Sequence, residues 1–216
     1  MFFDTNGFES NPISIFLLQK PMTKNSLQRR RATISSLGII TAIAFSLIQS
    51  VPYATAMHDD DVPTWSSGSQ TYYCTWSLGY VDNQYVDSCN DFDDAADTWN
   101  SVSSSTWNLT YNVFGLWVQS DPLGSDGPWA ETVVRYTGSP GTITSADITF
   151  NNDKTFGSGA NPSGAGDFKT VSIHEQGHLL HLEHNTSSSS VMYYSLPANT
   201  IRTIDSHDED AIQGLY

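Results

Sequence analysis

The apolar positions along the chain change their period several times, and each period predicts a different element. Between residues 86 and 102 they recur at steps of three and four, which predicts an amphipathic helix. Residues 107–113 alternate apolar with polar side chains, as a half-buried strand does. Further strands are expected over residues 71–78, 116–119, 130–136 and 146–151.

The second half of the chain returns to helix. Residues 151–166 are rich in Asn, Gly and Ser, which predicts a loop, and a helix is expected to begin near Asp167. Ser206 and Glu209 have the spacing of a capping box ahead of a C-terminal apolar run. The order strand, helix, several strands, helix, helix is typical of an α+β domain with one twisted sheet.

The leading segment has the pattern of a secretion signal. Lys24 and the run of arginines at 29–31 precede an apolar stretch of 15 residues, 34–48, and a small-x-small pattern ends at Ala56. We expect residues 1–56 to be a leader that is cleaved after Ala56. Within it, Met22 is the expected true start, so that residues 1–21 would be an upstream extension. An uncleaved membrane anchor is the alternative, although a span needs about 20 apolar residues. The protein is therefore expected to be secreted, with no stable membrane association.

The remainder shows one composition and no repeat, so one domain is expected. We predict a loose lead-in over residues 57–70 and a folded domain over residues 71–216. Because export implies an oxidising environment, Cys74 and Cys89 are predicted to form a disulfide. Closing a loop of that length stabilises a fold by about 3 kcal/mol. Two buried free thiols are the alternative.

The charge of the chain limits its partners. The net charge is −14, and residues 57–216 carry 21 acidic against four basic side chains. Such a surface repels phosphates, which excludes nucleic acid and anionic lipid as partners. Calcium is compatible with it, and oxygen ligands are available from loops. The candidate calcium ligands are Asp121, Asp126, Asn151, Asn152 and Asp153.

The segment VSIHEQGHLLHLEH holds four of the six histidines and carries the chemistry. His174 and His178 are four residues apart, so on a helix their rings share one face and can bind one metal ion. Glu175 lies beside the first of them, where its carboxylate can reach a water on that metal. Zinc lowers the pKa of such a water to about 7. This set of side chains is suited to hydrolysing amide bonds.

The same segment resembles the HExxHxxGxxH zinc motif of the metzincin metallopeptidases, and Met192 resembles their Met-turn methionine. Within that clan the chain is most similar to a small secreted matrixin. The similarity extends to further stretches of the sequence: DFKTVSIHEQGH, VMYY, DEDAIQGLY, ADITFNND and AADTWNSVSSSTWNLTY.

The resemblance implies a fold, an activity and a set of site residues. The fold would be a metzincin-like zincin domain whose mostly parallel sheet has an antiparallel edge strand, with an active-site helix and a C-terminal helix. Residues 146–151 would be the edge strand that pairs with a peptide or protein substrate bound in extended form. The activity would be that of a zinc endopeptidase with one catalytic Zn²⁺. Its site would contain the ligands His174, His178 and His184, the base Glu175, and Met192 beneath the metal.

His181 departs from the family motif, which has glycine there. Glycine supplies a left-handed turn, and an L-residue in that conformation costs about 1–2 kcal/mol. If the helix continued instead, His181 would become the third ligand. However, it would then lie about 10.5 Å along the axis from His174, too far to share one metal. We therefore expect a strained turn at His181, with His184 as the ligand and with His58 and His207 as ordinary surface residues.

Two functions of different classes follow from the sequence. The first is an active secreted zinc endopeptidase, which the presence of Glu175 favours because a binding role has no need of a carboxylate there. The second is a non-catalytic zinc-bearing adhesion or peptide-binding module on a metzincin scaffold, which the departure at His181 favours. A monomer is expected in either case.

Overall fold

The computed structural model describes residues 13–14, 62–74, 79–81, 84–138, 141–158 and 164–216. The chain divides into two compact units, and the smaller, Leu18–Tyr53, lies wholly outside these residues. The predicted apolar signal stretch, the cleavage point after Ala56 and His58 also lie outside them. In the described part, no helix is long and apolar enough to cross a membrane.

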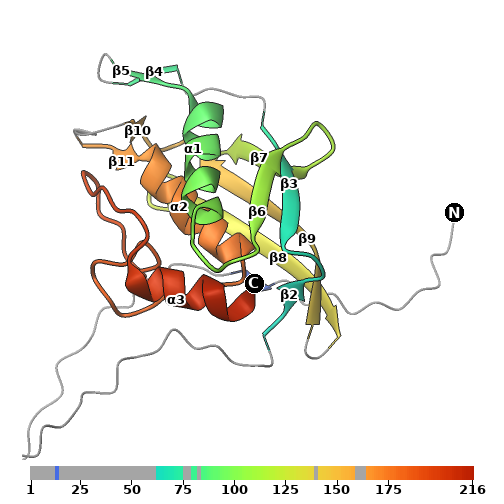
Figure 1. Cartoon of the computed structure of the whole chain (residues 1–216). Coiled ribbons are helices and arrows are strands. Elements are labelled where there is room, and N and C mark those ends of the chain that lie inside the picture. The colour runs from blue at the N-terminus through green and yellow to red at the C-terminus, as the bar shows by residue number, and fades with distance from the viewer. Residues whose placement is uncertain (1–12, 15–61, 75–78, 82–83, 139–140, 159–163) are drawn as a thin grey trace, which may run out of the picture. The chain divides into compact units, whose positions relative to one another are not determined.

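One twisted, mostly parallel sheet forms the framework (Figure 1). Its strand order is β1-β8-β9-β7-β3-β6, and β2 pairs with β9. The β8–β9 and β1–β8 pairs are antiparallel, and the other pairs in the sheet are parallel. The strands are β1 (Ile13–Ser14), β2 (Thr64–Trp65), β3 (Ser69–Tyr73), β6 (Asn108–Tyr111), β7 (Leu116–Asp121), β8 (Ala130–Gly138) and β9 (Gly141–Asn151). The predicted α+β class with a mostly parallel sheet is confirmed.

Two minor ribbons lie off the main sheet. Strands β4 (Gly79–Val81) and β5 (Gln84–Val86) pair antiparallel, and β10 (Phe156–Gly157) pairs in parallel with β11 (Gly166–Asp167). The second ribbon interrupts the stretch that the sequence predicts as one loop, residues 151–166. It ends directly at the start of the second helix and so fixes where that helix begins.

The prediction that residues 146–151 form the edge strand of the sheet is wrong. Residues 146–151 form the second half of β9, which is hydrogen-bonded to β7 on one side and to β8 on the other. The outer antiparallel strand is β8, whose far side carries only the short β1 at Val133 and Val134 among the described residues. An alternating pattern predicts which face of a strand is buried, but not its position in the sheet.

The described part of the lead-in, residues 62–70, is more ordered than its Ser- and Gly-rich composition suggests. Trp65, in β2, is buried, and its Nε1 donates a hydrogen bond to the Leu179 carbonyl 2.9 Å away. Strand β3 begins at Ser69, before the predicted start of the domain. A single aromatic residue therefore anchors a stretch whose composition alone predicts a loose segment.

An aspartate caps each of the three described helices, which are α1 (Ser88–Asn100), α2 (Phe168–Leu179) and α3 (Ser206–Leu215). Helices α1 and α2 pack against each other and against the sheet. The side chains of Asp87 and Asp167 accept hydrogen bonds from the first turns of α1 and α2. The capping box of α3 is formed by Asp205 and Asp208, one residue before the predicted pair, because the Asp205 carboxylate takes the N-cap position that the sequence pattern gives to Ser206.

Helix α2 is held in place by α1 and by the aromatic core. The indole of Trp99 donates to the Ile173 carbonyl, and the amide of Gln176 donates to the Phe92 carbonyl, each over 2.9 Å. Phe150 of β9 stacks on Phe168 at the start of α2, with ring centroids 4.4 Å apart. The predicted disulfide between Cys74 and Cys89 is present and joins the end of β3 to α1.

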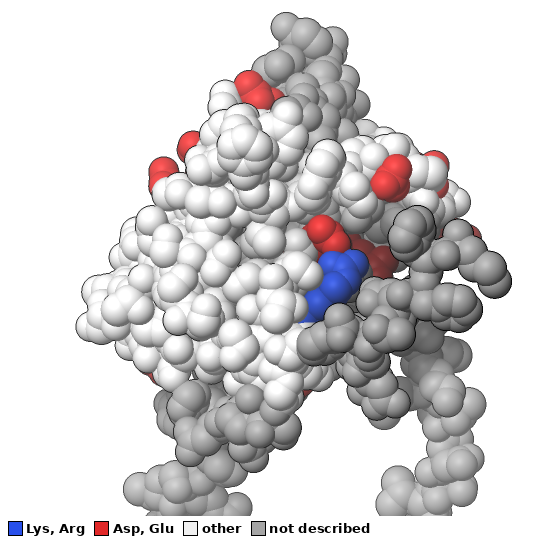
Figure 2. Space-filling view, turned by 90° about the vertical axis from the view of Figure 1, so that its right-hand side faces the viewer, with Lys and Arg blue, Asp and Glu red and all other residues white. Residues whose placement is uncertain are grey.

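Charge is unevenly distributed over the surface. On the face drawn in Figure 2, uncharged residues cover most of the area, and acidic side chains are scattered around it. Across β8 and β9, Arg135 and Asp147 form an ion pair between partly exposed side chains. Exposed pairs of this kind contribute about 0–1 kcal/mol, so the sheet depends on its core rather than on its surface charges.

Candidate metal centre

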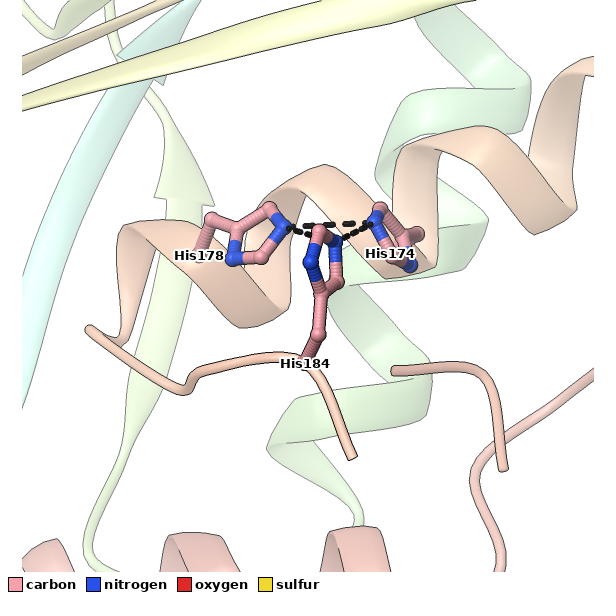
Figure 3. Close-up of side chains that lie close together, drawn as sticks. All are labelled: His174, His178 and His184. Atoms are coloured by element: carbon pink, nitrogen blue, oxygen red, sulfur yellow. Dashed lines mark hydrogen bonds between the residues drawn. The ribbon is translucent and has the colours of Figure 1, made fainter. Parts of the chain in front are cut away.

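Three imidazoles converge at the end of α2 (Figure 3). His174 and His178 lie one turn apart on the helix, and His184 reaches them from the segment that follows it. The Nε2 atoms are 3.2 Å apart between His174 and His178, and His184 Nε2 is 3.1 Å from each. A tetrahedral zinc ion with bonds of 2.0–2.1 Å sets its nitrogen ligands about 3.3 Å apart. The triangle therefore has the size of a zinc site.

Hydrogen bonds on the Nδ1 side of two of the rings determine the tautomer, and therefore whether each Nε2 carries a proton or a lone pair. His174 Nδ1 lies 2.7 Å from the Val191 carbonyl, and His178 Nδ1 lies 2.9 Å from the Leu182 carbonyl. A carbonyl only accepts, so each Nδ1 carries the proton and each Nε2 presents a lone pair to the centre. Two lone pairs 3.2 Å apart repel each other unless a cation lies between them. The donor set therefore fits a metal ion.

Burial keeps the rings in the ligand form. It lowers the pKa of His174 to about 4 and the pKa of His178 well below its ordinary value. Burial also lowers the pKa of His184. All three rings are therefore neutral near pH 7, and a neutral imidazole is the form that binds a metal.

The turn after α2 brings His184 back to the helix. The Leu182 N–H donates to the Gly177 carbonyl and the His181 N–H donates to the His178 carbonyl, which is the Schellman arrangement. His181 occupies the left-handed position of this turn, with φ of +67°. The expected strained turn is confirmed. The ring of His181 packs edge-on against Tyr136 of β8, with centroids 5.7 Å apart, outside the triangle.

Glu175 follows the first of these histidines and is itself buried. Only 5% of it is exposed, and this burial raises the pKa of its carboxyl group to about 7, although a hydrogen bond from Thr132 opposes the rise. Thr132 belongs to β8, so the carboxylate is held between the helix and the outer strand of the sheet. A buried carboxylate thus belongs to the residue that directly follows the first of the three potential metal ligands.

A family model of the matrixins matches residues 64–216, most of the chain. This protein belongs to the matrixin family. Matrixins are zinc metallopeptidases that are typically extracellular and act on peptides, so the His triad of this chain points to zinc. A search of curated proteins found no match.

In this matrixin, Met192 lies under α2 and is buried. Its sulfur packs against the backbone of the helix at Gly177, where an added Cβ would lie 2.2 Å from Met192 Sδ and 3.2 Å from the Trp99 ring. A methyl group at this position cannot be accommodated without moving the methionine. Gly177 is a site residue that the sequence analysis does not single out.

Gly177→Ala is therefore expected to destabilise the matrixin domain. The gain in helix propensity is about 1 kcal/mol, but overpacking a filled core costs about 1–3 kcal/mol, and here the methyl overlaps a sulfur atom. Gly214→Ala, on the exposed side of α3, is the matched control and should stabilise by up to about 1 kcal/mol. Urea unfolding of the two variants tests this, and equal shifts in the same direction would contradict it.

Asp208 connects α3 to the metal centre, and its role is not evident from the capping pattern alone. Its buried carboxylate accepts hydrogen bonds from the Ser190 hydroxyl, the Val191 N–H and the Asp205 N–H. The Val191 carbonyl in turn holds His174 Nδ1. One capping carboxylate thus also fixes the turn before Met192 and, through it, the first histidine.

Calcium binding by the loop oxygens stays a prediction, and one of the candidate ligands is engaged in other contacts. The side-chain oxygen of Asn151 accepts from the Leu123 and Asp153 N–H groups, and its amide donates to the carbonyls of Gly124 and Pro128. That side chain is fully used in fastening the loop. Among the described residues, the only group of His, Cys, Asp or Glu with metal-ligand spacing is the His triad. His207 lies on α3, 3.4 Å from Asp205, and is not part of it.

Proposed function

We propose that this matrixin is a secreted zinc endopeptidase whose zinc ligands are His174, His178 and His184. The observation that carries the proposal is the convergence of three neutral imidazole Nε2 atoms, with the buried Glu175 following the first of these histidines in sequence. A zinc ion held there would supply Lewis-acid chemistry, acidifying water and polarising the scissile carbonyl. Residues 1–56 would direct export and be removed after Ala56.

Glu175 would act as the general base and then as the general acid. Its carboxylate takes a proton from the attacking water and delivers it to the leaving amine nitrogen. A carboxyl group whose pKa is near 7 is suited to both directions of transfer at neutral pH. Met192 would form the floor beneath the site, because it packs against Gly177 in the middle of the motif.

Once residues 1–56 are removed, and β1 with them, the substrate would be an extended peptide added along the outer side of β8. This strand is antiparallel to β9, and Thr132 joins it to Glu175, so a peptide paired with it would pass close to the carboxylate. This position replaces the one that the sequence analysis assigns to residues 146–151. The departure at His181, which favours the non-catalytic alternative, is accommodated by the turn and leaves the triad intact.

Incubation of the secreted protein with a diverse peptide library, with and without a zinc chelator, tests the function. Cleavage that stops on chelation and returns with added zinc is the expected result. Stoichiometric zinc binding without any cleavage would instead support the adhesion or peptide-binding module. The cleavage sites would also give the sequence preference on either side of the scissile bond.

A further inference from the structure

Thr132 is the one side chain of the sheet that hydrogen-bonds to the Glu175 carboxylate among the described residues. It lies on the buried face of β8, with 4% of the residue exposed. Its Oγ1 is 2.5 Å from Glu175 Oε2 and 3.1 Å from the Glu175 main-chain oxygen. The two residues are 43 positions apart in sequence, so only the fold brings them together.

The hydroxyl has a single proton, and the distances indicate where it goes. Hydrogen bonds from a hydroxyl to an ionised carboxylate are 2.5–2.7 Å long and about twice as strong as bonds between neutral groups. The contact to Oε2 has this length, and the contact to the main-chain oxygen does not. Thr132 therefore donates to the carboxylate.

Such a bond restricts a side chain that is otherwise mobile. Glutamate has three rotatable bonds, whereas threonine is branched at Cβ and stiff. Thr132 is also fixed by its place opposite Ile148 in the antiparallel β8–β9 pair. A bond from this rigid donor to Oε2 sets the plane of the carboxylate and leaves Oε1 as the oxygen that can exchange a proton with water.

We propose that Thr132 is a positioning residue, which orients the Glu175 carboxylate for proton transfer. The inference rests on the proposed function, since it gives Thr132 a part in that reaction. It also makes β8 serve two purposes, because the strand that would pair with substrate through its outer edge holds the base through its inner face. The same strand would thereby fix the position of the substrate relative to the base.

Three threonine variants separate this role from mere support of the fold. Thr132→Val removes the hydroxyl, keeps the branched shape and suits a strand. Thr132→Ser keeps the hydroxyl. Thr170→Val is the matched control, since Thr170 is another buried threonine whose hydroxyl donates to a carboxylate, that of Asp167 at the start of α2.

We expect Thr132→Val to lower kcat by about 10- to 100-fold with KM and zinc content unchanged, because small misplacements of a catalytic group cost factors of this size. Thr132→Ser should recover most of the loss. Thr170→Val should lower the urea midpoint yet keep kcat per folded molecule. A kcat for Thr132→Val equal to that of the wild type, or a loss that Ser does not recover, would overturn the proposal.

A second readout does not depend on activity. In metal-free protein, the urea midpoints of Thr132→Val, Glu175→Ala and the double variant should be non-additive, because the first substitution has no bond left to remove once the second is made. Additive shifts would show that the bond is absent and would overturn the inference even if the wild type cleaves peptides. Failure of the wild type to cleave any peptide would instead overturn the proposed function, and with it the catalytic part of the inference.

Discussion

Glu175→Gln is expected to abolish most peptide hydrolysis while leaving the zinc content near one per chain. The amide can still occupy the buried space and accept the hydrogen bond from Thr132, but it cannot take a proton from water. Loss of a general base typically costs about 10²–10⁴-fold in rate. Parallel measurement of kcat/KM and of bound zinc by elemental analysis checks both halves of the expectation.

Glu209→Gln is the matched control for this substitution. Glu209 is exposed on α3 and touches none of the three histidines, so removing its charge should leave the rate and the zinc content unchanged. A Glu175→Gln variant as fast as wild type would contradict the proposed mechanism. A variant that had lost its zinc as well would mean that the carboxylate supports the ligand set rather than the proton transfer.

The parts of the site that sequence alone could predict are those with a local cause. His174 and His178 share a face and Glu175 borders it, because all three lie on one helix and a helix has a fixed period. The turn at His181 also follows from local geometry, since a continued helix would carry that ring about 10.5 Å away from His174. The pairing of Cys74 with Cys89 needs only export and a short loop.

The parts that sequence could not predict depend on contacts between distant segments. Thr132 reaches Glu175 across 43 residues, and Asp208 reaches the Val191 N–H across 17. Neither residue has a period or spacing that marks it, because each looks like an ordinary strand or capping residue in the linear pattern. The order of strands in the sheet is a non-local property too, which is why β9 was expected at the edge.

Gly177 lies between these two cases. Gly177 is part of the HEQGH motif. The reason that a larger residue does not fit there is Met192, which approaches the helix from a separate turn. A glycine in the middle of a helix costs about 1 kcal/mol relative to alanine. That cost is a signal which could have been read from the sequence, since a glycine in a helix interior indicates a close approach by another group.

The third ligand gives the sharpest test of the metal centre. His184→Ala is expected to weaken zinc binding by more than about 100-fold, because loss of even an outer hydrogen-bond partner of a ligand costs about 10–100-fold. His184 Nε2 forms two of the three short contacts in the triangle, so its removal leaves only the pair on the helix. Titration of metal-free protein with zinc against a competing chelator measures the change.

His181→Gly is the control that isolates the effect of the ligand from that of the turn. Glycine adopts a φ of +67° without the strain of an L-residue, which is about 1–2 kcal/mol. The substitution also removes a buried Nδ1 that has no hydrogen-bond partner among the described residues. The loss of packing against Tyr136 offsets part of this gain. We therefore expect unchanged zinc affinity and an unfolding free energy higher by about 1 kcal/mol. Zinc lost from the His181 variant but retained by the His184 variant would reverse the assignment of the third ligand, because the turn would then have to unwind and bring the other imidazole to the metal.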